Sequence, residues 1–419
     1  MDIGCDEERR VTLSRRRLLA AGAAGTFAGL AGSQLDTQLA FAADPAYSGD
    51  VLVLLSLCGG FDGLSAVVPA GDPAYYTARP GIAVPKAQLI GGGTFFGLHP
   101  ALAPLLPFWN SGKLAAVQAV GQPAPNRSHF AAMEELERAA PGTSLRTGWL
   151  SRMLGSRGAD NLFDAIAMGT PRPDRVLEGP ASYLGLTSID GLALTGDDAA
   201  KPLAATMAAL YQGAPATLAR PAGRLTGALA WAKTMRAAGY TPANGASYPT
   251  TELGAALRDV ARLIKANAGL MTATVDCGDW DMHENLGIAE PGRQMHDQLA
   301  KLAGALAAFA TDLGPDGLRR VTLVTISEFG RRVTQNGSGG LDHGYGNAMF
   351  VLGGAVRGGK VYGTWPGLTA DKLRDGDLAV TTDYRAVIGE ILRARCGVGD
   401  LSSVFPGVSA ATLGLVTAR

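Results

Sequence analysis

The feature that most constrains the fold is a set of short, continuous apolar runs, each bounded by turn residues. Runs that are apolar throughout are typical of strands in a parallel sheet whose two faces are both covered. A helical pattern at residues 295–314 lies between two of these runs and completes a strand–helix–strand unit. We therefore predict a doubly wound α/β domain with a mainly parallel sheet and helices on both faces, with strands at 51–57, 113–120, 163–169, 270–276, 320–327 and 348–354.

One stretch does not fit this alternation of strand and helix. Residues from about 172 to 268 are rich in alanine, and 200–213 and 224–239 are helical patterns separated by Gly/Pro segments. We predict that 172–268 is an inserted helical subdomain of a larger domain over 43–419. With 47% hydrophobic residues, the chain has enough apolar side chains to fill such a core.

The charges of the chain are balanced, with 37 Lys and Arg residues against 37 Asp and Glu residues. Nucleic-acid binding proteins carry a basic face or stripe, and no such excess is present here. After the N-terminal segment, no stretch is apolar and long enough to span a bilayer. The composition therefore predicts neither a nucleic-acid partner nor a membrane span in the mature chain.

The N-terminus predicts export. Ser14 and the arginines Arg15 and Arg16 precede a mildly hydrophobic Ala/Gly-rich run, and Ala40-Phe41-Ala42 is a small-x-small cleavage site. Twin arginines before a weakly apolar run indicate the twin-arginine export machinery as a partner, and a periplasmic or secreted location. We predict a twin-arginine signal peptide at 1–42.

Three cysteines remain after the predicted cleavage. Cys58, Cys277 and Cys396 have no ligand-like spacing. Cys58 and Cys277 each end an apolar run, so they fit either a disulfide in an oxidising compartment or two buried thiols.

Polar side chains follow the predicted strands where each strand ends. In open α/β sheets, ligands bind outside the carboxyl ends of the strands, so these residues are candidates for one shared site. They are Asp62, then Arg127, Ser128 and His129, then Asp279, Asp281 and His283, then Glu328, Arg331 and Arg332, and finally Asp342 and His343.

Each of these motifs also has a simpler structural interpretation. Asp62 fits a turn, Ser128 fits the N-cap of a helix, and the arginines fit a solvated strand end. Residues 276–285, "DCGDWDMHEN", favour a metal site more strongly, since a carboxylate and an imidazole two positions apart can face one ion. Several such motifs at one sheet edge are hard to explain as turns alone.

Taken together, the motifs resemble a known family. "CGGFDGLSAVVP", "NRSHFAAME", "GDWDMHEN", "SEFGRR" and "DHGYGNAMFVLGG" occur in the order found in exported bacterial proteins of domain-of-unknown-function family 1501, from about residue 50 to the C-terminus. That family is similar in fold to the alkaline phosphatase and sulfatase superfamily. The resemblance implies a doubly wound sheet with metal ligands at the strand ends.

The resemblance also implies roles for individual residues. Asp62 matches the aspartate after the superfamily's first strand, and Ser128 matches its nucleophile at the start of a helix. Its later Asp–His pair resembles Asp281 and His283, or Asp279 and His283.

The final histidine of the superfamily's site resembles His343. A strand-end Asp–His pair is replaced in this chain by Glu328-Phe329, so one carboxylate is kept and one histidine is lost. One divalent metal, Zn, Ca, Mg or Mn, is therefore expected, held by Asp62, Asp279, Asp281, His283, Glu328, Asp342 and His343.

Two principal functions follow from this pattern. The first is a metal-dependent hydrolase of phosphate or sulfate esters, with Ser128 as nucleophile, His129 beside it, and Arg127, Arg331 or Arg332 holding the anionic ester. The second is an exported module without catalysis that binds a small ligand or an assembly partner. A purely structural role is the third, but it would leave costly unpaired acids.

The targeting prediction can be tested directly. Replacing Arg15 and Arg16 by Lys should stop export without harming the fold, because the pathway reads the arginine pair. Cell fractionation with immunoblotting measures this, and the same replacement at Arg9 and Arg10 is the matched control. Mature double-lysine protein outside the cytoplasm would contradict the prediction.

Overall fold

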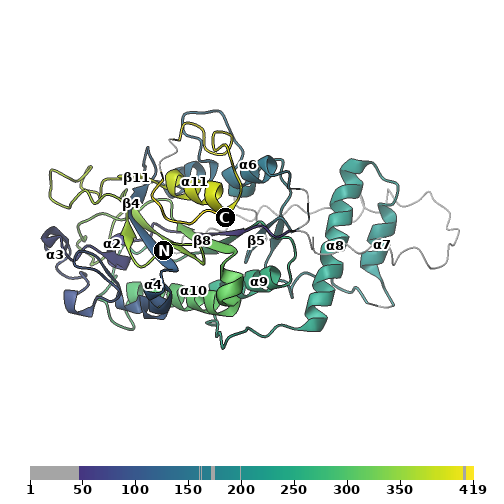
Figure 1. The fold of residues 1–419 in the computed structure, drawn as a ribbon, viewed down its shortest axis with the longest axis horizontal. Coiled ribbons are helices and arrows are strands. Elements are labelled where there is room, and N and C mark those ends of the chain that lie inside the picture. Colours follow the sequence, from purple (N-terminus) through teal and green to yellow (C-terminus); the bar gives the residue numbers. More distant parts are fainter. Residues whose placement is uncertain (1–46, 160, 162, 171–174, 199, 409–411) are drawn as a thin grey trace. The chain divides into compact units, whose positions relative to one another are not determined.

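The computed structural model describes residues 47–159, 161, 163–170, 175–198, 200–408 and 412–419 (Figure 1). The signal peptide expected at 1–42 lies outside the described residues.

A sheet of nine strands forms the centre of the fold. All six predicted strands are part of it, and β1 has the predicted bounds. The order across the sheet is β10 (Val361–Tyr362), β4 (Leu114–Gly121), β9 (Asn347–Gly353), β8 (Val321–Ile326), β1 (Val51–Leu57), β7 (Thr272–Cys277), β5 (Ala165–Met168) and β6 (Leu184–Leu186), with β11 (Thr382–Asp383) also paired to β4.

The direction of one strand, β9, differs from the rest of the sheet. β9 pairs antiparallel with both β4 and β8, whereas the other pairs of this sheet are parallel. A parallel return needs a long crossover, usually a helix, and residues 327–346 between β8 and β9 contain none. The chain therefore turns back at the carboxyl edge of the sheet. The start of β9, rather than its end, lies at that edge.

Helices cover both faces of the sheet, which confirms the predicted doubly wound architecture (Figure 1). Alternate residues of β1 enter different cores: Val53 and Leu55 enter one, and Leu52 and Leu54 enter the other. The first core is completed by α9 (Glu252–Lys265), α10 (Gln294–Leu318) and η2 (Pro100–Leu105), and the second by α5 (His129–Arg138), α6 (Trp149–Ser156) and α11 (Tyr384–Arg395).

The remaining elements are short. They are α2 (Gly63–Ala66), β2 (Val67–Val68), α3 (Pro73–Ala78), η1 (Lys86–Gln88), β3 (Gly97–Leu98), α4 (Leu106–Asn110) and η3 (Arg175–Leu177). The helix predicted at 295–314 corresponds to α10, which has a kink at Gly314, where φ is 65°, directly before Pro315.

The stretch predicted as a helical insertion is only partly separate from the sheet domain. β6 pairs with β5 inside the sheet, and α9 packs on β7 and β5. The two alanine-rich patterns form α7 (Leu203–Leu210) and α8 (Ala216–Ala238), which pack on each other. The sheet domain thus includes both the start and the end of this stretch, because β6 and α9 bury apolar residues there.

A further observation concerns the cysteines. The backbones of Cys58 and Cys277 are hydrogen bonded at 2.9 Å, yet none of the three cysteines of the described residues forms a disulfide. Burial raises the pKa of Cys277 to about 11, so its thiol stays protonated.

Within the described part of the chain, we find no helix whose length and apolar character would let it traverse a bilayer.

Candidate metal centre

Loops from distant parts of the sequence meet at the carboxyl edge of the sheet. The Glu328 carboxylate after β8 accepts a hydrogen bond from the Gly59 N–H after β1, at 2.8 Å. The Gly344 N–H, in the loop before β9, donates to the Gly330 carbonyl at 2.9 Å. A Cβ on Gly344 would lie 2.5 Å from the Arg331 backbone, so the close approach of these two loops requires glycine.

Three side chains from these loops bring possible ligand atoms together. His129, Asp281 and His343 each offer one such atom, and the three atoms lie within 4.8 Å of one another. His129 Nε2 is 3.1 Å from His343 Nε2. The Asp281 carboxylate lies 3.2 Å from His343 Nε2 and 3.6 Å from His129 Nε2.

His283 extends this group on its other side. Its Nε2 lies 2.9 Å from His343 Nε2 and 3.0 Å from Asp281 Oδ1. We call His129, Asp281, His283 and His343 the histidine cluster. It unites the loops after β4 and β7 with the loop before β9, and the antiparallel direction of β9 is what brings His343 to this edge.

The outer nitrogen of each imidazole already faces an oxygen. His129 Nδ1 lies 2.8 Å from Glu328 Oε1, His343 Nδ1 lies 2.8 Å from the Arg127 carbonyl, and His283 Nδ1 lies 3.4 Å from Asp342 Oδ1. An oxygen of a carbonyl or carboxylate accepts, so each Nδ1 fits the role of donor. The Nε2 atoms of His129 and His343 then remain, beside the Asp281 carboxylate, as ligand atoms for a cation.

The charges around the cluster also favour a cation. Asp281, Glu328 and Asp342 contribute three carboxylates, and Arg331 contributes a guanidinium that contacts the cluster. Burial would raise the pKa of Glu328, but its hydrogen bonds with His129 and with backbone groups together outweigh burial and hold that pKa below its usual value. The carboxylates around the cluster thus outnumber the guanidinium that contacts it.

The pKa values of the two central histidines move in opposite directions. The hydrogen bond with Glu328 raises the pKa of His129. Burial lowers the pKa of His343. The two rings thus differ in their affinity for a proton, and a metal ion would have to displace any proton bound at a ligand nitrogen.

Arg331 holds the loops in place rather than pointing into open space. Its side chain is 1% exposed. It donates to the carbonyls of Gly59, Gly60, Trp280 and Leu341, and it pairs with Asp281 at 2.5 Å. This guanidinium is therefore saturated by the protein, and the expectation that it holds a ligand anion does not fit its contacts.

Asp62 also departs from its expected role as a metal ligand. Both of its oxygens bind the Arg79 guanidinium, at 2.6 and 2.9 Å, and one accepts from the Ser65 N–H as the N-cap of α2. Arg79 is 0% exposed and Asp62 is 2% exposed. Burial would raise the pKa of Asp62, but the charge and hydrogen bonds of Arg79 together with the Ser65 hydrogen bond outweigh burial and lower that pKa. The carboxylate is thus part of a buried ion pair.

The other predicted residues lie around the cluster. Arg127 pairs with Asp377, and Arg332 lies 3.7 Å from the same carboxylate, so neither guanidinium faces the cluster. Asp279 is exposed, with a φ of 66°, and Asp342 lies outside His283 as its hydrogen-bond partner.

Ser128 is exposed at the N-cap of α5, directly before His129, and its hydroxyl makes no capping hydrogen bond. The Ser128 N–H donates instead to Asn126 Oδ1 at 3.0 Å. The serine thus has the predicted position without the stabilising contact of a cap.

Sequence reasoning missed the residues that orient the loops. Arg79 follows Asp62 by 17 positions with no motif around it, so no local signal indicates the pairing. Asn347, in the "DHGYGN" motif, accepts from the Gly63 N–H and donates to the Phe329 carbonyl. A buried asparagine at a strand start could have been suspected, because its amide needs partners.

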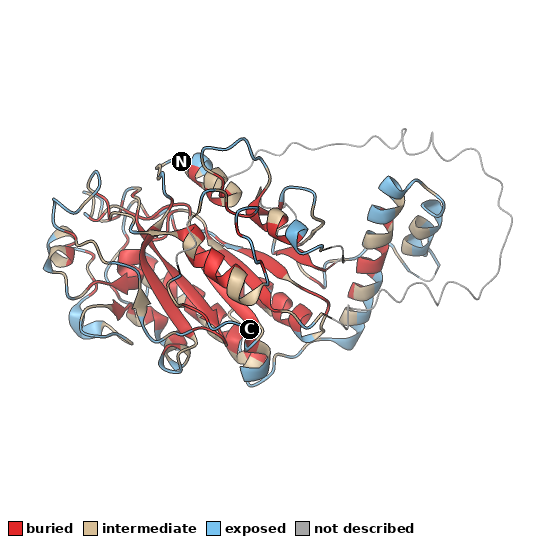
Figure 2. Cartoon of the chain, turned by 45° about the horizontal axis from the view of Figure 1, so that its top comes forward, coloured by how far each residue is buried: buried red, intermediate tan, exposed pale blue. Residues whose placement is uncertain are grey.

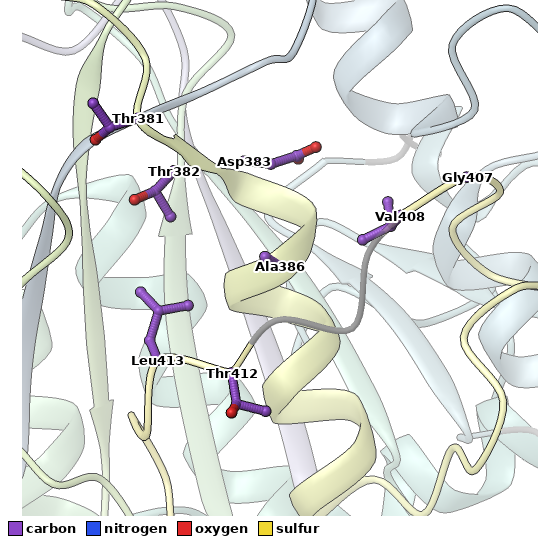
Figure 3. Close-up of a pocket in the computed structure, with 8 residues that line it drawn as sticks. All are labelled: Thr381, Thr382, Asp383, Ala386, Gly407, Val408, Thr412 and Leu413. Carbon is purple, nitrogen blue, oxygen red and sulfur yellow. The ribbon is translucent and has the colours of Figure 1, made fainter.

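A separate cavity lies beside the first turn of α11 and has a volume of about 290 Å³ (Figure 3). Its lining consists of Thr381, Thr382, Asp383, Ala386, Gly407, Val408, Thr412 and Leu413. No member of the histidine cluster lines it.

The buried ion pair of Asp62 and Arg79 predicts that replacing Asp62 lowers the stability of the fold rather than the binding of a metal. Asp62→Asn should cost about 3–5 kcal/mol in the free energy of unfolding, because Arg79 stays buried without its carboxylate. The lowered pKa means that this contribution is present above the unfolded pKa of about 3.9 and is lost as pH falls through the folded value.

Urea unfolding across pH measures the effect, and Asp72→Asn is the control, since Asp72 caps α3 without a buried arginine. The gap between wild type and Asp62→Asn should shrink below about pH 4. A variant of normal stability that lost bound metal would show instead that Asp62 is a ligand.

Comparisons with known proteins place this site in a wider context. The chain resembles the crystal structure of the lipoteichoic acid synthase LtaP from Listeria monocytogenes with 8% identity and a TM-score of 0.32, covering 80% of this chain and 74% of that chain. It resembles the crystal structure of the PsFucS1 sulfatase from Pseudoalteromonas sp. with 11% identity and a TM-score of 0.34, covering 88% and 74%. Likenesses at this level transfer no activity.

The family match is firmer. No curated protein matches the chain. Residues 109–388 match the model of the family described as protein of unknown function (DUF1501), a range that contains the histidine cluster and Arg331 but begins after β1 and Asp62. The match is thus shorter than the motifs suggested, yet it covers well over half of the chain. The chain belongs to this family of proteins of unknown function.

Proposed function

We propose that this chain is an exported, metal-dependent hydrolase acting on phosphate or sulfate esters. The observation that carries the proposal is that the Nε2 atoms of His129 and His343 and the Asp281 carboxylate lie close enough together to hold one ion, with His283 Nε2 2.9 Å from His343 Nε2. The Nδ1 of each of these rings faces an oxygen. Such a donor set is incomplete without a cation.

The donor atoms narrow the choice of metal. Ca²⁺ and Mg²⁺ prefer oxygen ligands, whereas imidazole nitrogen suits Zn²⁺ and neighbouring transition metals. Two ligands about 2.0–2.1 Å from a tetrahedral zinc lie about 3.3 Å apart, close to the observed separations of 2.9–3.6 Å. Of the four metals expected from the sequence, zinc fits best, with His129, Asp281 and His343 as its ligands and His283 beside them.

The surrounding residues supply what a bound metal needs. Glu328 holds the His129 ring through its Nδ1, and Arg331 fixes Asp281. These contacts orient the ligands and keep their rings from rotating. A bound zinc ion would supply Lewis-acid polarisation of an ester oxygen.

Ser128 is the residue that we propose as nucleophile. Its hydroxyl is exposed, uncommitted to capping and adjacent in sequence to His129. The N–H groups in the first turn of α5 favour a negatively charged ester group near this hydroxyl. Attack by the Ser128 oxygen would form a covalent ester and release the alcohol of the substrate.

A second function is favoured by one specific observation. The three arginines expected to hold the anion are each engaged, Arg331 by carbonyls and Asp281, and Arg127 and Arg332 by Asp377. A site without an uncommitted guanidinium fits a metal-binding module that recruits a ligand or an assembly partner without turnover.

Export belongs to the same proposal. The twin arginines and the Ala40-Phe41-Ala42 site support passage through the twin-arginine machinery and a periplasmic or secreted location. This pathway carries folded proteins, so a metal could be loaded before export.

Metal analysis tests the bound metal that both proposed functions require. Protein purified without chelator should hold about one divalent ion per chain, and His129→Ala or His343→Ala should lose it. Glu328→Gln should weaken zinc affinity about 10–100-fold, because the His129 ring loses its carboxylate partner. His296→Ala is the control, as His296 pairs with Asp297. A wild type that binds no zinc on titration would refute the metal centre.

Turnover separates the two functions. Ser128→Ala should abolish hydrolysis of generic phosphate or sulfate esters with almost no change in stability, since its hydroxyl makes no capping bond. Thr251→Ala is the matched control. Thr251 caps α9 at 3.1 Å, so its loss should cost about 1 kcal/mol and leave turnover intact. If the wild-type protein loaded with zinc hydrolysed none of the esters, the result would favour the binding module.

A further inference from the structure

A pocket with a volume of about 240 Å³ lies at the amino end of β1, away from the histidine cluster. Its lining includes Asp50, which directly precedes β1, whereas the cluster is built on loops at the carboxyl edge of the sheet. β1 spans seven residues, so its length separates the two places by about 20 Å. Figure 2 colours the strands of the sheet as buried, so the base of the pocket rests on the core.

Positive charge is concentrated in this pocket. Among the described residues that line it, four are arginines and one is an acid, namely Arg157, Arg393, Arg395, Arg419 and Asp50. Four guanidiniums and one carboxylate leave three positive charges, in a chain whose formal net charge is zero. A concave surface lined by one sign of charge attracts ions of the opposite sign.

The other titratable groups of the lining do not offset this charge. Burial raises the pKa of the Tyr47 hydroxyl to about 12, and it raises the pKa of the Cys396 thiol to about 12. Both groups therefore stay protonated and neutral near pH 7. The surplus of positive charge in the pocket persists.

Helix ends explain only part of the arginine content. Arg157 is the C-cap of α6, and Arg393 and Arg395 lie in the last turn of α11. The C-terminus of a helix carries about half a negative charge, so two helix ends offset about one of the three surplus charges. About two positive charges remain for a ligand.

One of the arginines forms the base of the pocket. Arg395 pairs with Asp50 at 2.5 Å, and the two side chains are 8% and 2% exposed. Arg395 also donates to the carbonyls of Thr417 and Arg319. Its guanidinium is therefore engaged by the protein, and the ion pair leaves the charges above it without a carboxylate partner.

Two of the other arginines keep donors for a ligand. Arg157 is exposed, and its guanidinium donates to the Gly397 carbonyl at 3.1 Å. Arg419 is 49% exposed, donates to the Ser48 carbonyl and lies 3.6 Å from the Asp50 carboxylate. A guanidinium has five N–H donors, so these contacts leave several donors of each side chain uncommitted.

We propose that this pocket binds a small tetrahedral oxyanion such as a phosphate group, held by Arg157 and Arg419 with Arg393 beside them. Guanidiniums match phosphate oxygens in charge and in the geometry of their donors. Pockets for larger ligands have volumes of about 300–1,000 Å³, so the smaller volume here suits a single anionic group rather than a whole nucleotide. Free phosphate and the phosphate of a lipid headgroup share this chemistry.

Isothermal titration calorimetry of the full chain with sodium phosphate tests the proposal. At constant ionic strength, wild type should bind phosphate with a Kd of about 1 mM or tighter. Arg157→Gln with Arg419→Gln should weaken binding about tenfold or more, because the charge-assisted hydrogen bonds of two guanidiniums are lost. Arg146→Gln with Arg220→Gln, which removes the same charge from exposed arginines elsewhere, is the matched control.

A second background separates this pocket from the metal centre, where an anion could also bind. His343→Ala removes a proposed metal ligand, and phosphate binding by the pocket should persist in it. Zinc content and the urea midpoint report on the folding of each variant. If the double variant does not fold, Arg157→Gln alone should still weaken binding about threefold or more.

Vesicles distinguish the two sources of the anion. Co-sedimentation with vesicles of phosphatidylcholine and phosphatidic acid, lost in the double variant and reduced by free phosphate, would assign a lipid headgroup. Calorimetric binding without such co-sedimentation would assign free phosphate.

Three outcomes would overturn the proposal. Phosphate binding that disappears in His343→Ala would place the anion at the metal centre. Equal losses in the control and the pocket variants would reduce the effect to net charge. Absence of phosphate binding by folded wild type would show that the pocket holds no anion.

Discussion

The guanidinium of Arg331 is the contact on which the site depends most. It joins the backbones after β1 and β7 to the loop before β9, and it binds the Asp281 carboxylate at 2.5 Å. A buried cation of this kind is stable only while its partners are present, because an unpaired charge in the interior is costly. Arg331 is therefore one of the side chains that hold the loops carrying Asp281, His283 and His343 together.

Around this centre, cations and carboxylates are paired in a way that leaves the cluster acidic. Arg79 is neutralised by Asp62, and Arg127 by Asp377. Asp281 pairs with Arg331, whereas Glu328 and Asp342 face His129 and His283. A site with this balance attracts a metal ion before it attracts an anion, so recognition of an ester would depend on the bound metal. This distinction separates the hydrolase from the binding module.

The metal centre and the α7–α8 hairpin are supported by different parts of the fold. The metal centre rests on loops at the edge of the sheet, where buried strands fix the backbone on both sides. The α7–α8 hairpin is anchored through α8, where Trp231 packs on Phe163 and Arg236 donates to the Leu192 carbonyl, and its turn is exposed. A change in the hairpin should therefore leave the geometry of the histidine cluster unaltered.

The sequence by itself determined the sheet, because continuous apolar runs bury both faces of a strand whatever the tertiary context. It also identified His129, His283 and His343 together with Asp281, since polar residues at strand ends share one edge. It could not determine the direction of β9, which depends on whether the β8–β9 connection contains a helix.

Only the tertiary structure decided the partners of the charged groups. Asp62 and Asp281 both follow a strand and look equivalent in sequence, yet Arg79 binds the first and Arg331 orients the second. Which arginine reaches which carboxylate depends on loops that are 17 and 50 positions apart along the chain and adjacent in space. Local sequence carries no record of such pairings, because the energy of an ion pair depends on distance and burial rather than on position in the chain.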